Sequence, residues 1–160
     1  MSALQKLAET LAACHNLEDG ELLLLLRDSG PHTREVRRQK AQAQAQAFYG
    51  SQVFIRGLIE FTNFCKNDCY YCGIRRSNPQ AQRYRLSQEQ IPACCQAGYG
   101  LGFRTFVLQG GEDPWFTDER LCAMVRAIKE RWPDCAVTLS VGERSRESYR
   151  LLKEAGADRY

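Results

Sequence analysis

Three cysteines, Cys65, Cys69 and Cys72, stand within eight consecutive positions in the spacing C-x3-C-x2-C. Thiolates this close together in sequence are typical ligands of zinc or of an iron–sulfur cluster, and both kinds of structural site normally use four protein ligands. No fourth cysteine or histidine stands next to this group. A four-iron cluster held by three thiolates leaves one iron open, where a substrate can bind as the electron arrives. We therefore favour a cluster with an open iron.

A zinc site is the alternative hypothesis for the same cysteines. It would have to recruit Asp68, Cys94, Cys95 or a residue that follows the present sequence. The two histidines, His15 and His32, lie far upstream on helical segments, where we expect them at the surface. Apart from that alternative, we expect the remaining cysteines to be small buried hydrophobic side chains. These are Cys14, Cys94, Cys95, Cys122 and Cys135.

A second motif follows the short apolar run TFVLQ, where Gly110, Gly111 and Glu112 precede an Asp-Pro pair. Two glycines allow the backbone to approach a ligand closely, and a carboxylate can accept hydrogen bonds from an ammonium group. Alone, the motif is also typical of a turn at the end of a strand. Because it comes one strand–helix unit after the cysteines, we favour a ligand-binding role.

The elements around these motifs predict two segments. Residues 1–50 are expected to be helical, with Thr33 capping a helix that ends near Gly50, and residues 51–160 alternate between strands and helices. Extended runs at 52–63, 105–109 and 136–141 are separated by helical patterns, and ADRY begins a fourth strand. Such a series predicts a parallel sheet with right-handed crossovers.

Helical spacing predicts which side chains of the later helices are buried. The helix opened by Ser87 and Gln90 has a capping-box pattern, Thr117 is expected to cap the next helix, and Gly156 to end the last. The expected inward faces are Leu121, Val125, Ile128 and Trp132, then Tyr149, Leu152 and Ala155.

The predicted fold class is α/β: the N-terminal part of a (β/α) barrel, preceded by helices. A complete eight-stranded barrel needs roughly 250 residues, so we expect the barrel to be incomplete and the chain to break off in its fourth strand. An unpaired sheet edge would then favour aggregation of the isolated chain.

Composition limits the partners. A net charge of +3 and no basic tract interleaved with aromatic residues argue against nucleic acid. The N-terminus lacks a signal-peptide pattern, and the leucine run 22–26 is too short to cross a bilayer. We therefore expect a cytoplasmic protein with no membrane partner, in which cysteines are reduced and available to a metal.

The cysteine spacing, with Tyr71 just before Cys72, resembles the signature of the radical S-adenosylmethionine (SAM) enzymes. The resemblance implies that the three thiolates hold a 4Fe-4S cluster and that the amino and carboxylate groups of SAM chelate the fourth iron. Electron transfer then cleaves the C–S bond of SAM to give a 5′-deoxyadenosyl radical. It also implies that the motif Gly110, Gly111 and Glu112 engages the amino group of the methionine moiety.

A longer stretch, from Arg56 to Tyr160, is similar to the biotin-synthase-like branch of that family, and most similar to the [FeFe]-hydrogenase maturation enzymes of the HydE type. This implies a small-molecule or organometallic substrate and an electron donor such as a ferredoxin or flavodoxin. It also implies contact with other hydrogenase maturation proteins. Other members of the branch, of the biotin synthase or methylornithine synthase type, and a non-enzymatic metal-binding module remain alternatives. We expect the isolated chain to be inactive, and no catalytic residue is assigned.

Polar residues at the predicted strand ends complete the candidate site. Gln109 either lies near the substrate or cofactor or is satisfied by backbone at the strand end. Ser140 and Glu143 either line the SAM pocket or belong to a polar turn. Glu60 could point into the barrel, where it would need a partner.

Overall fold

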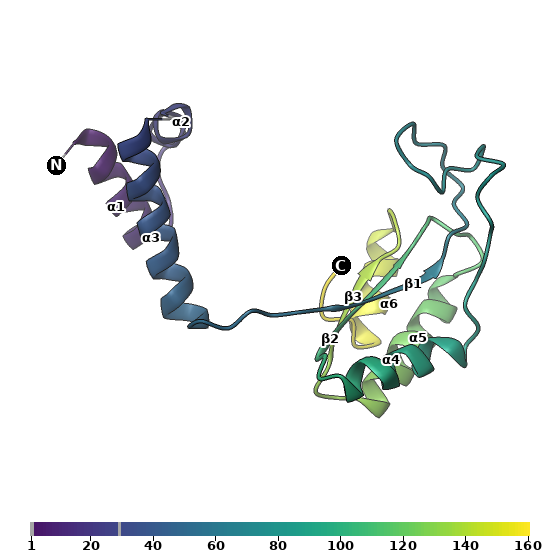
Figure 1. Cartoon of the computed structure of the whole chain (residues 1–160). Helices are drawn as coiled ribbons and strands as arrows, with labels where there is room; N and C mark the ends of the chain where they lie inside the picture. Colours follow the sequence, from purple (N-terminus) through teal and green to yellow (C-terminus); the bar gives the residue numbers. More distant parts are fainter. Residues whose placement is uncertain (1, 29) are drawn as a thin grey trace. The chain divides into compact units, whose positions relative to one another are not determined.

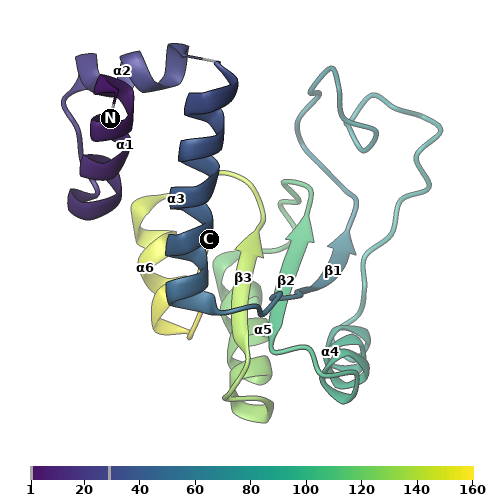
Figure 2. The ribbon, with the colours of Figure 1, turned by 60° about the vertical axis from the view of Figure 1, so that its left-hand side comes forward.

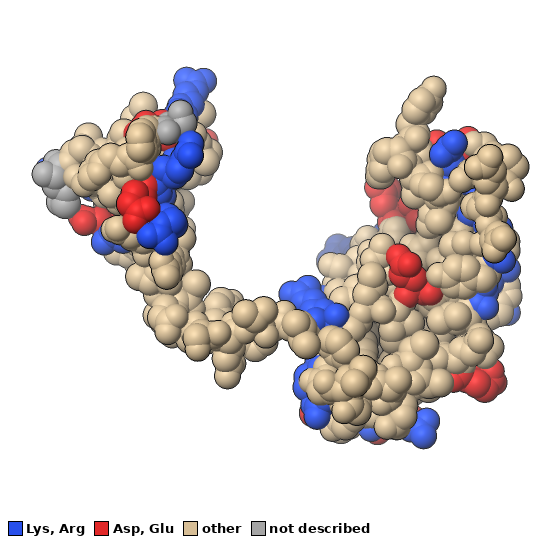
Figure 3. Space-filling model, viewed as in Figure 1, with Lys and Arg blue, Asp and Glu red and all other residues tan. Residues whose placement is uncertain are grey.

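A computed structural model describes residues 2–28 and 30–160, which form two compact units. One unit ends at Phe54 and the other begins at Ile55. Residues 52–56, between the last helix of the first unit and the first strand of the second, have no regular secondary structure. Figure 3 shows acidic and basic side chains interspersed on each unit. Within the described residues, no helix is long and apolar enough to cross a membrane.

The first unit consists of helices drawn in purple to blue in Figure 1: α1 (Ala3–Cys14), α2 (Asp19–Arg27) and α3 (Pro31–Tyr49). Arg37 on α3 donates hydrogen bonds to the backbone carbonyls of Leu25 and Asp28. The prediction that Thr33 caps α3 is wrong. Thr33 is buried at the third position of the helix, which begins at Pro31 after Gly30. Proline suits the first helical position because its missing N–H has no partner there.

The second unit is an α/β fold with three parallel strands in the order β1-β2-β3. Its elements are β1 (Gly57–Thr62), α4 (Gln90–Gly100), β2 (Thr105–Gly110), α5 (Asp118–Arg131), β3 (Ala136–Ser140) and α6 (Arg146–Glu154). Arg159 forms a parallel bridge with Thr138, so a further extended segment begins beside β3. The predicted α/β class with an open parallel sheet is confirmed.

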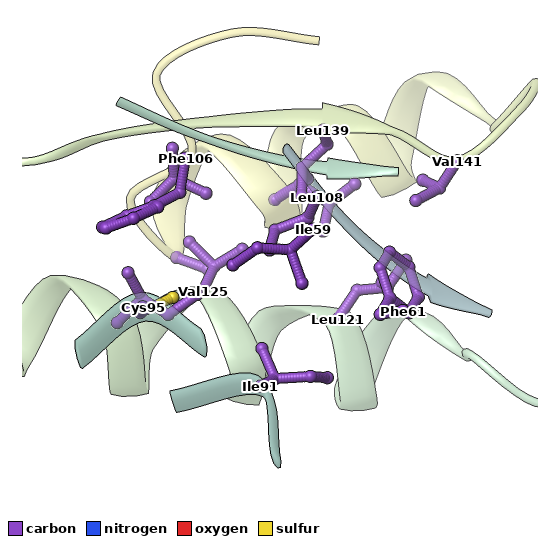
Figure 4. Packing of buried hydrophobic residues seen from close by; sticks show 14 of the residues in the cluster. Ile59, Phe61, Ile91, Cys95, Phe106, Leu108, Leu121, Val125, Leu139 and Val141 are labelled. Carbon is purple, nitrogen blue, oxygen red and sulfur yellow. The ribbon is translucent and has the colours of Figure 1, made fainter. Parts of the chain in front are cut away.

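The core lies between the sheet and its helices, as Figure 4 shows for the side chains between the strands and α4 and α5. Alternate strand residues point to this side, as the strand period requires. They are Ile59, Phe61, Phe106, Leu108, Val137 and Leu139. The predicted face of α5 is confirmed: Leu121, Val125, Ile128 and Trp132 are all buried.

Three helix-level predictions have different outcomes. Ser87 and Gln90 do exchange the predicted capping-box hydrogen bonds, at 2.8 and 3.3 Å. Thr117 does occupy the N-cap of α5, and its side chain makes no capping bond there. The inward position predicted for Tyr149 is wrong. It is 40% exposed, and its ring meets the ring of Tyr160 edge to face at 4.7 Å.

Of the cysteines outside the motif, some are buried and others are exposed. Cys95, Cys122 and Cys135 are buried, as predicted, but Cys14 and Cys94 are exposed. On α4, neighbouring residues face different sides, so only one of the pair Cys94 and Cys95 can point to the sheet. Both histidines are exposed, as predicted.

Candidate metal and cofactor site

The carboxyl ends of the three strands lie at one edge of the sheet, and the long loop that carries the motif cysteines leaves the end of β1 there (Figure 2). We call residues 63–84 the cysteine loop. The turn after β2, which we take as residues 110–113 and which includes the last strand residue, and the segment after β3, residues 141–145, lie at the same edge. Parallel strands place their successive loops together, and loops at this end of α/β barrels carry the chemistry.

The cysteine loop has little regular structure but many internal hydrogen bonds. Arg83 donates to the carbonyls of Asn63, Ile74 and Arg75 at 2.5, 2.8 and 2.7 Å. The amide of Arg76 donates to the carbonyl of Asn67 at 2.8 Å. These bonds satisfy backbone groups that have no sheet or helix partner, so the loop is folded on itself.

The three motif thiols are free: Cys65 and Cys72 are partly buried and Cys69 is exposed. The amide of Cys72 donates to the carbonyl of Cys69 at 3.0 Å, which turns the backbone between these two residues. Across residues 2–28 and 30–160, no three Cys, His, Asp or Glu side chains converge closely enough to hold a metal ion. The three thiols lie in one loop, and their sulfur atoms would have to move closer together to bind a cluster.

Two of the fourth ligands that the zinc alternative would recruit, Asp68 and Cys95, differ in their surroundings within the described residues. The exposed carboxylate of Asp68 accepts a hydrogen bond from the amide of Ser77 at 3.0 Å, and this bond lowers the pKa of Asp68 and keeps it in the ionised form that metals bind. Cys95 is fully buried on α4, where burial raises the pKa of its thiol to about 12 and disfavours the thiolate that metals bind.

The cysteine loop is hydrogen-bonded to the turn after β2 through Glu112. The amide of Lys66 donates to the Glu112 carbonyl at 2.9 Å. The Glu112 carboxylate accepts from Nδ2 of Asn67 at 2.6 Å, and one of its oxygens lies 3.0 Å from Nζ of Lys66. The predicted cysteine and glycine motifs are therefore in direct contact, in part through two residues, Lys66 and Asn67, that the sequence patterns did not single out.

This contact requires glycine at position 111. A Cβ atom at Gly111 would lie 2.2 Å from the carbonyl oxygen of Phe64 and 2.8 Å from Cβ of Cys65. We predicted that the glycines allow close approach to a ligand. In the structure the group that approaches Gly111 is the cysteine loop itself. Gly110 is similarly enclosed, because its Cβ would lie 2.6 Å from Cγ2 of Thr62.

A cleft of about 380 Å³ opens beside Glu112, between the turn after β2 and the segment after β3. Charged side chains of both signs line it, among them Lys66, Glu112, Glu143 and Arg144. Gly142 comes against the Glu112 side chain from the β3 segment. Its φ of +82° and a Cβ position 1.9 Å from Cγ of Glu112 leave room for glycine only.

Three other predicted polar residues form a row on the opposite face of the sheet from the core. Glu60 pairs in register with Gln109, and Gln109 with Ser140. All three are exposed, and their side chains make no hydrogen bond within the described parts of the chain. Glu60 therefore lies on the open face of the sheet, the face that we expected to turn into the barrel. Tyr71 stands apart, 94% exposed on the cysteine loop.

A family model described as the radical SAM superfamily matches residues 59–160. The chain belongs to the radical SAM superfamily. Members of this superfamily bind a 4Fe-4S cluster and SAM. The donor set of this chain fits the cluster, because three unpaired thiols share one loop and that loop contacts a glycine-glycine-glutamate turn.

Individual relatives in the superfamily are enzymes. The chain is 45% identical over 113 residues to the [FeFe] hydrogenase maturase subunit HydE of Thermotoga maritima, covering 71% of this chain and 32% of that protein. It is 29% identical over 157 residues to 3-methylornithine synthase of Methanosarcina acetivorans, covering 97% and 44%.

A solved structure of methylornithine synthase (PylB) has a TM-score of 0.77 and 27% identity to this chain, covering 94% of this chain and 45% of that one. The chain thus spans about a third to just under half the length of the proteins it matches. This likeness confirms the predicted fold: the sheet corresponds to part of a radical SAM barrel and is not closed.

Proposed function

We propose that this chain carries the cluster-binding part of a radical SAM enzyme, with Cys65, Cys69 and Cys72 as the three ligands of a 4Fe-4S cluster. The observation that supports this most is the docking of the cysteine loop on the turn that carries Glu112. When bound, the cluster supplies the electron that cleaves the C–S bond of SAM. The protein residues bind and orient the two groups.

Glu112 can accept a further hydrogen bond while it holds the loop. A carboxylate has about four lone-pair sites, of which Asn67 and Lys66 use one each. The remaining sites are free to accept from the ammonium group of SAM. Gly110 and Gly111 keep the turn close to the thiols. Gln109 and Ser140, together with Glu60, present a polar row to ligands on the open face of the sheet. Tyr71 remains a proposed cofactor contact.

For the whole protein we propose a role in assembling the diiron site of [FeFe] hydrogenase. The support is the 45% identity to the hydrogenase maturase HydE. The substrate would then be a small organic or organometallic molecule, the electron donor a ferredoxin or flavodoxin, and further maturation proteins the partners. The site of action would be the cytoplasm, and residues 1–50 and 51–160 would be separate segments of the protein.

A second candidate is a methylornithine synthase or biotin synthase activity. The observation that favours it is the share of this chain that each match includes. The match to methylornithine synthase includes 97% of this chain, whereas the match to HydE includes 71%. Substrate analysis of the whole protein would distinguish the two.

Anaerobic reconstitution with iron and sulfide tests the proposal. We expect about four iron and four sulfide ions per chain, because the three motif cysteines of each chain would hold one 4Fe-4S cluster. Uptake of zinc alone, or of fewer than four irons at saturation, would contradict the proposed site and favour a structural metal-binding module.

A further inference from the structure

Asp113 is the only buried carboxylate among the described residues, with 2% of its surface exposed. Its carboxylate accepts hydrogen bonds from Nε and Nη2 of Arg85 at 2.6 and 2.9 Å. It also accepts from Oγ1 of Thr62 at 2.8 Å and from the amide of Trp115 at 3.1 Å. Such a fork-to-fork pair fixes the relative orientation of its two partners as well as their distance.

These contacts reach the residue that precedes the first ligand cysteine. Cζ of Arg85 lies 3.8 Å from the centre of the Phe64 ring, and the Phe64 amide donates to Oγ1 of Thr62 at 3.2 Å. A guanidinium group on an aromatic face is attracted to the ring electrons. Asp113 therefore holds Phe64 through two intermediates, the side chains of Arg85 and Thr62.

The Arg85–Asp113 pair also lies at the base of the cysteine loop, where the two ends of the loop meet. Thr62 and Arg85 form an antiparallel bridge on either side of it, and the amide of Leu86 donates to the carbonyl of Phe61 at 2.8 Å. Asp113 directly follows Glu112, and its amide donates to the carbonyl of Gly111 at 2.8 Å. One carboxylate thus joins both ends of the loop to the turn after β2.

We propose that the Arg85–Asp113 pair is a positioning device that locks the cysteine loop onto the Gly110–Glu112 turn. It keeps the thiols and the Glu112 carboxylate in a fixed relation. Within the described residues neither side chain is hydrogen-bonded to a motif thiol, so both act through Phe64, Thr62 and the turn. This inference deepens the proposed function and rests on it, because the loop is worth positioning only if its cysteines bind the cluster.

Amide hydrogen exchange on the metal-free full chain tests the lock without the cluster. The amides to follow are Lys66, which bonds the turn, and Arg76, which bonds within the loop. In Asp113→Asn we expect them to exchange about tenfold faster or more, because a charged hydrogen-bonded pair is lost. Amides of β2 and β3 should keep their wild-type rates. Lys129→Met is the matched control, since away from the loop it removes an ion pair with Asp158 and a hydrogen bond to the carbonyl of Cys135.

A second variant separates orientation from charge. Arg85→Lys keeps the positive charge but loses the fork and the flat guanidinium, so we expect it to loosen the loop as Asp113→Asn does. Wild-type exchange of the loop amides in Arg85→Lys would overturn the proposal. So would equal acceleration of the loop and strand amides in Asp113→Asn, because that is simple destabilisation. If Asp113→Asn does not fold, the exchange of Arg85→Lys decides.

The reconstituted protein gives an independent readout. In both variants we expect lower iron retention on gel filtration and a shifted or broadened electron paramagnetic resonance (EPR) spectrum, while Lys129→Met matches wild type. A wild-type spectrum and full iron retention in both variants would contradict the inference. If the wild-type chain itself takes up no cluster, the proposed function fails, whereas the exchange data still show whether the pair orders the loop.

Discussion

Gly111 and Phe64 are in contact so close that a Cβ atom on Gly111 would lie 2.2 Å from the Phe64 carbonyl oxygen. This contact joins two sequence motifs that are separated by a whole strand–helix unit. It makes the geometry of the candidate site sensitive to a single methyl group.

We therefore expect Gly111→Ala to push the cysteine loop off the turn. Overpacking of this kind lowers the free energy of unfolding by about 1–3 kcal/mol, and we expect cluster uptake to fall as well. Gly100→Ala is the matched control. Its added Cβ meets nothing within 4 Å, and alanine favours the helix by about 1 kcal/mol. Denaturation curves and iron analysis check both variants. Equal cluster uptake in Gly111→Ala and wild type would show that the contact is not required.

Removal of one thiol tests the ligand assignment. Cys69→Ala should abolish the complete 4Fe-4S cluster, because two thiolates cannot replace three. Cys94→Ala, which removes an exposed thiol on α4, should reconstitute like wild type. Iron and sulfide analysis with EPR distinguishes the variants. A full cluster in Cys69→Ala would refute the assignment, and so would loss of the cluster only in Cys94→Ala.

Glu112 is expected to bind the ammonium group of SAM. Glu112→Gln removes the charge while it keeps the side-chain length, so we expect the affinity of the reconstituted protein for SAM to fall about tenfold or more. Glu130→Gln removes an exposed carboxylate on α5 and serves as the control. Equilibrium binding of SAM measures the effect. Unchanged affinity in Glu112→Gln would limit this residue to holding Lys66 and Asn67.

The buried thiol of Cys95 predicts a loss of stability in alkali. Burial, aided by the neighbouring thiols Cys94 and Cys135, raises the pKa of Cys95 to about 12. In the unfolded chain a cysteine ionises near pH 8.5. Above that pH the unfolded state binds fewer protons than the folded state, so the free energy of unfolding decreases as pH rises towards 12. This contribution is fully present below about pH 8.

Denaturant unfolding of the reduced protein at pH 7.5 and 9.5 checks this prediction. Cys95→Ala should lose less stability between the two pH values than wild type, and Cys14→Ala, which changes an exposed thiol, should lose as much as wild type. An alkaline loss as large in Cys95→Ala as in wild type would show that this thiol does not contribute.

The sequence predicted the parts of the fold that follow from periodicity. The strands alternate between covered and open faces, and α5 buries residues three or four positions apart, such as Leu121, Val125 and Ile128, so both could be read from hydrophobic spacing.

The prediction for Tyr149 failed because α6 buries Ser148 and Leu152, so that Tyr149, one position along the helix, is exposed and packs against Tyr160. The prediction that Thr33 caps α3 rested on a side chain that suits a cap. It failed because Gly30 is the N-cap and the helix already begins at Pro31.

The sequence predicted the motifs of the candidate site but not the hydrogen bonds between them. Successive loops of a parallel sheet meet at one edge, so the cysteines and Glu112 could be placed near each other from topology alone. The partners of Glu112 and Asp113 could not. Asn67 is 45 residues from Glu112, and Arg85 is 28 from Asp113. Pairings of this kind depend on the path of an irregular loop, which has no period. Asp113 instead followed the pattern of an ordinary Asp-Pro turn.

The central claim is that three thiolates hold a cluster whose fourth iron is open to SAM. The most direct test is the EPR spectrum of the reconstituted, reduced protein before and after addition of SAM. We predict the signal of a reduced 4Fe-4S cluster whose g values shift when SAM is added, because SAM binds the cluster itself. A cluster signal that SAM leaves unchanged would contradict the claim.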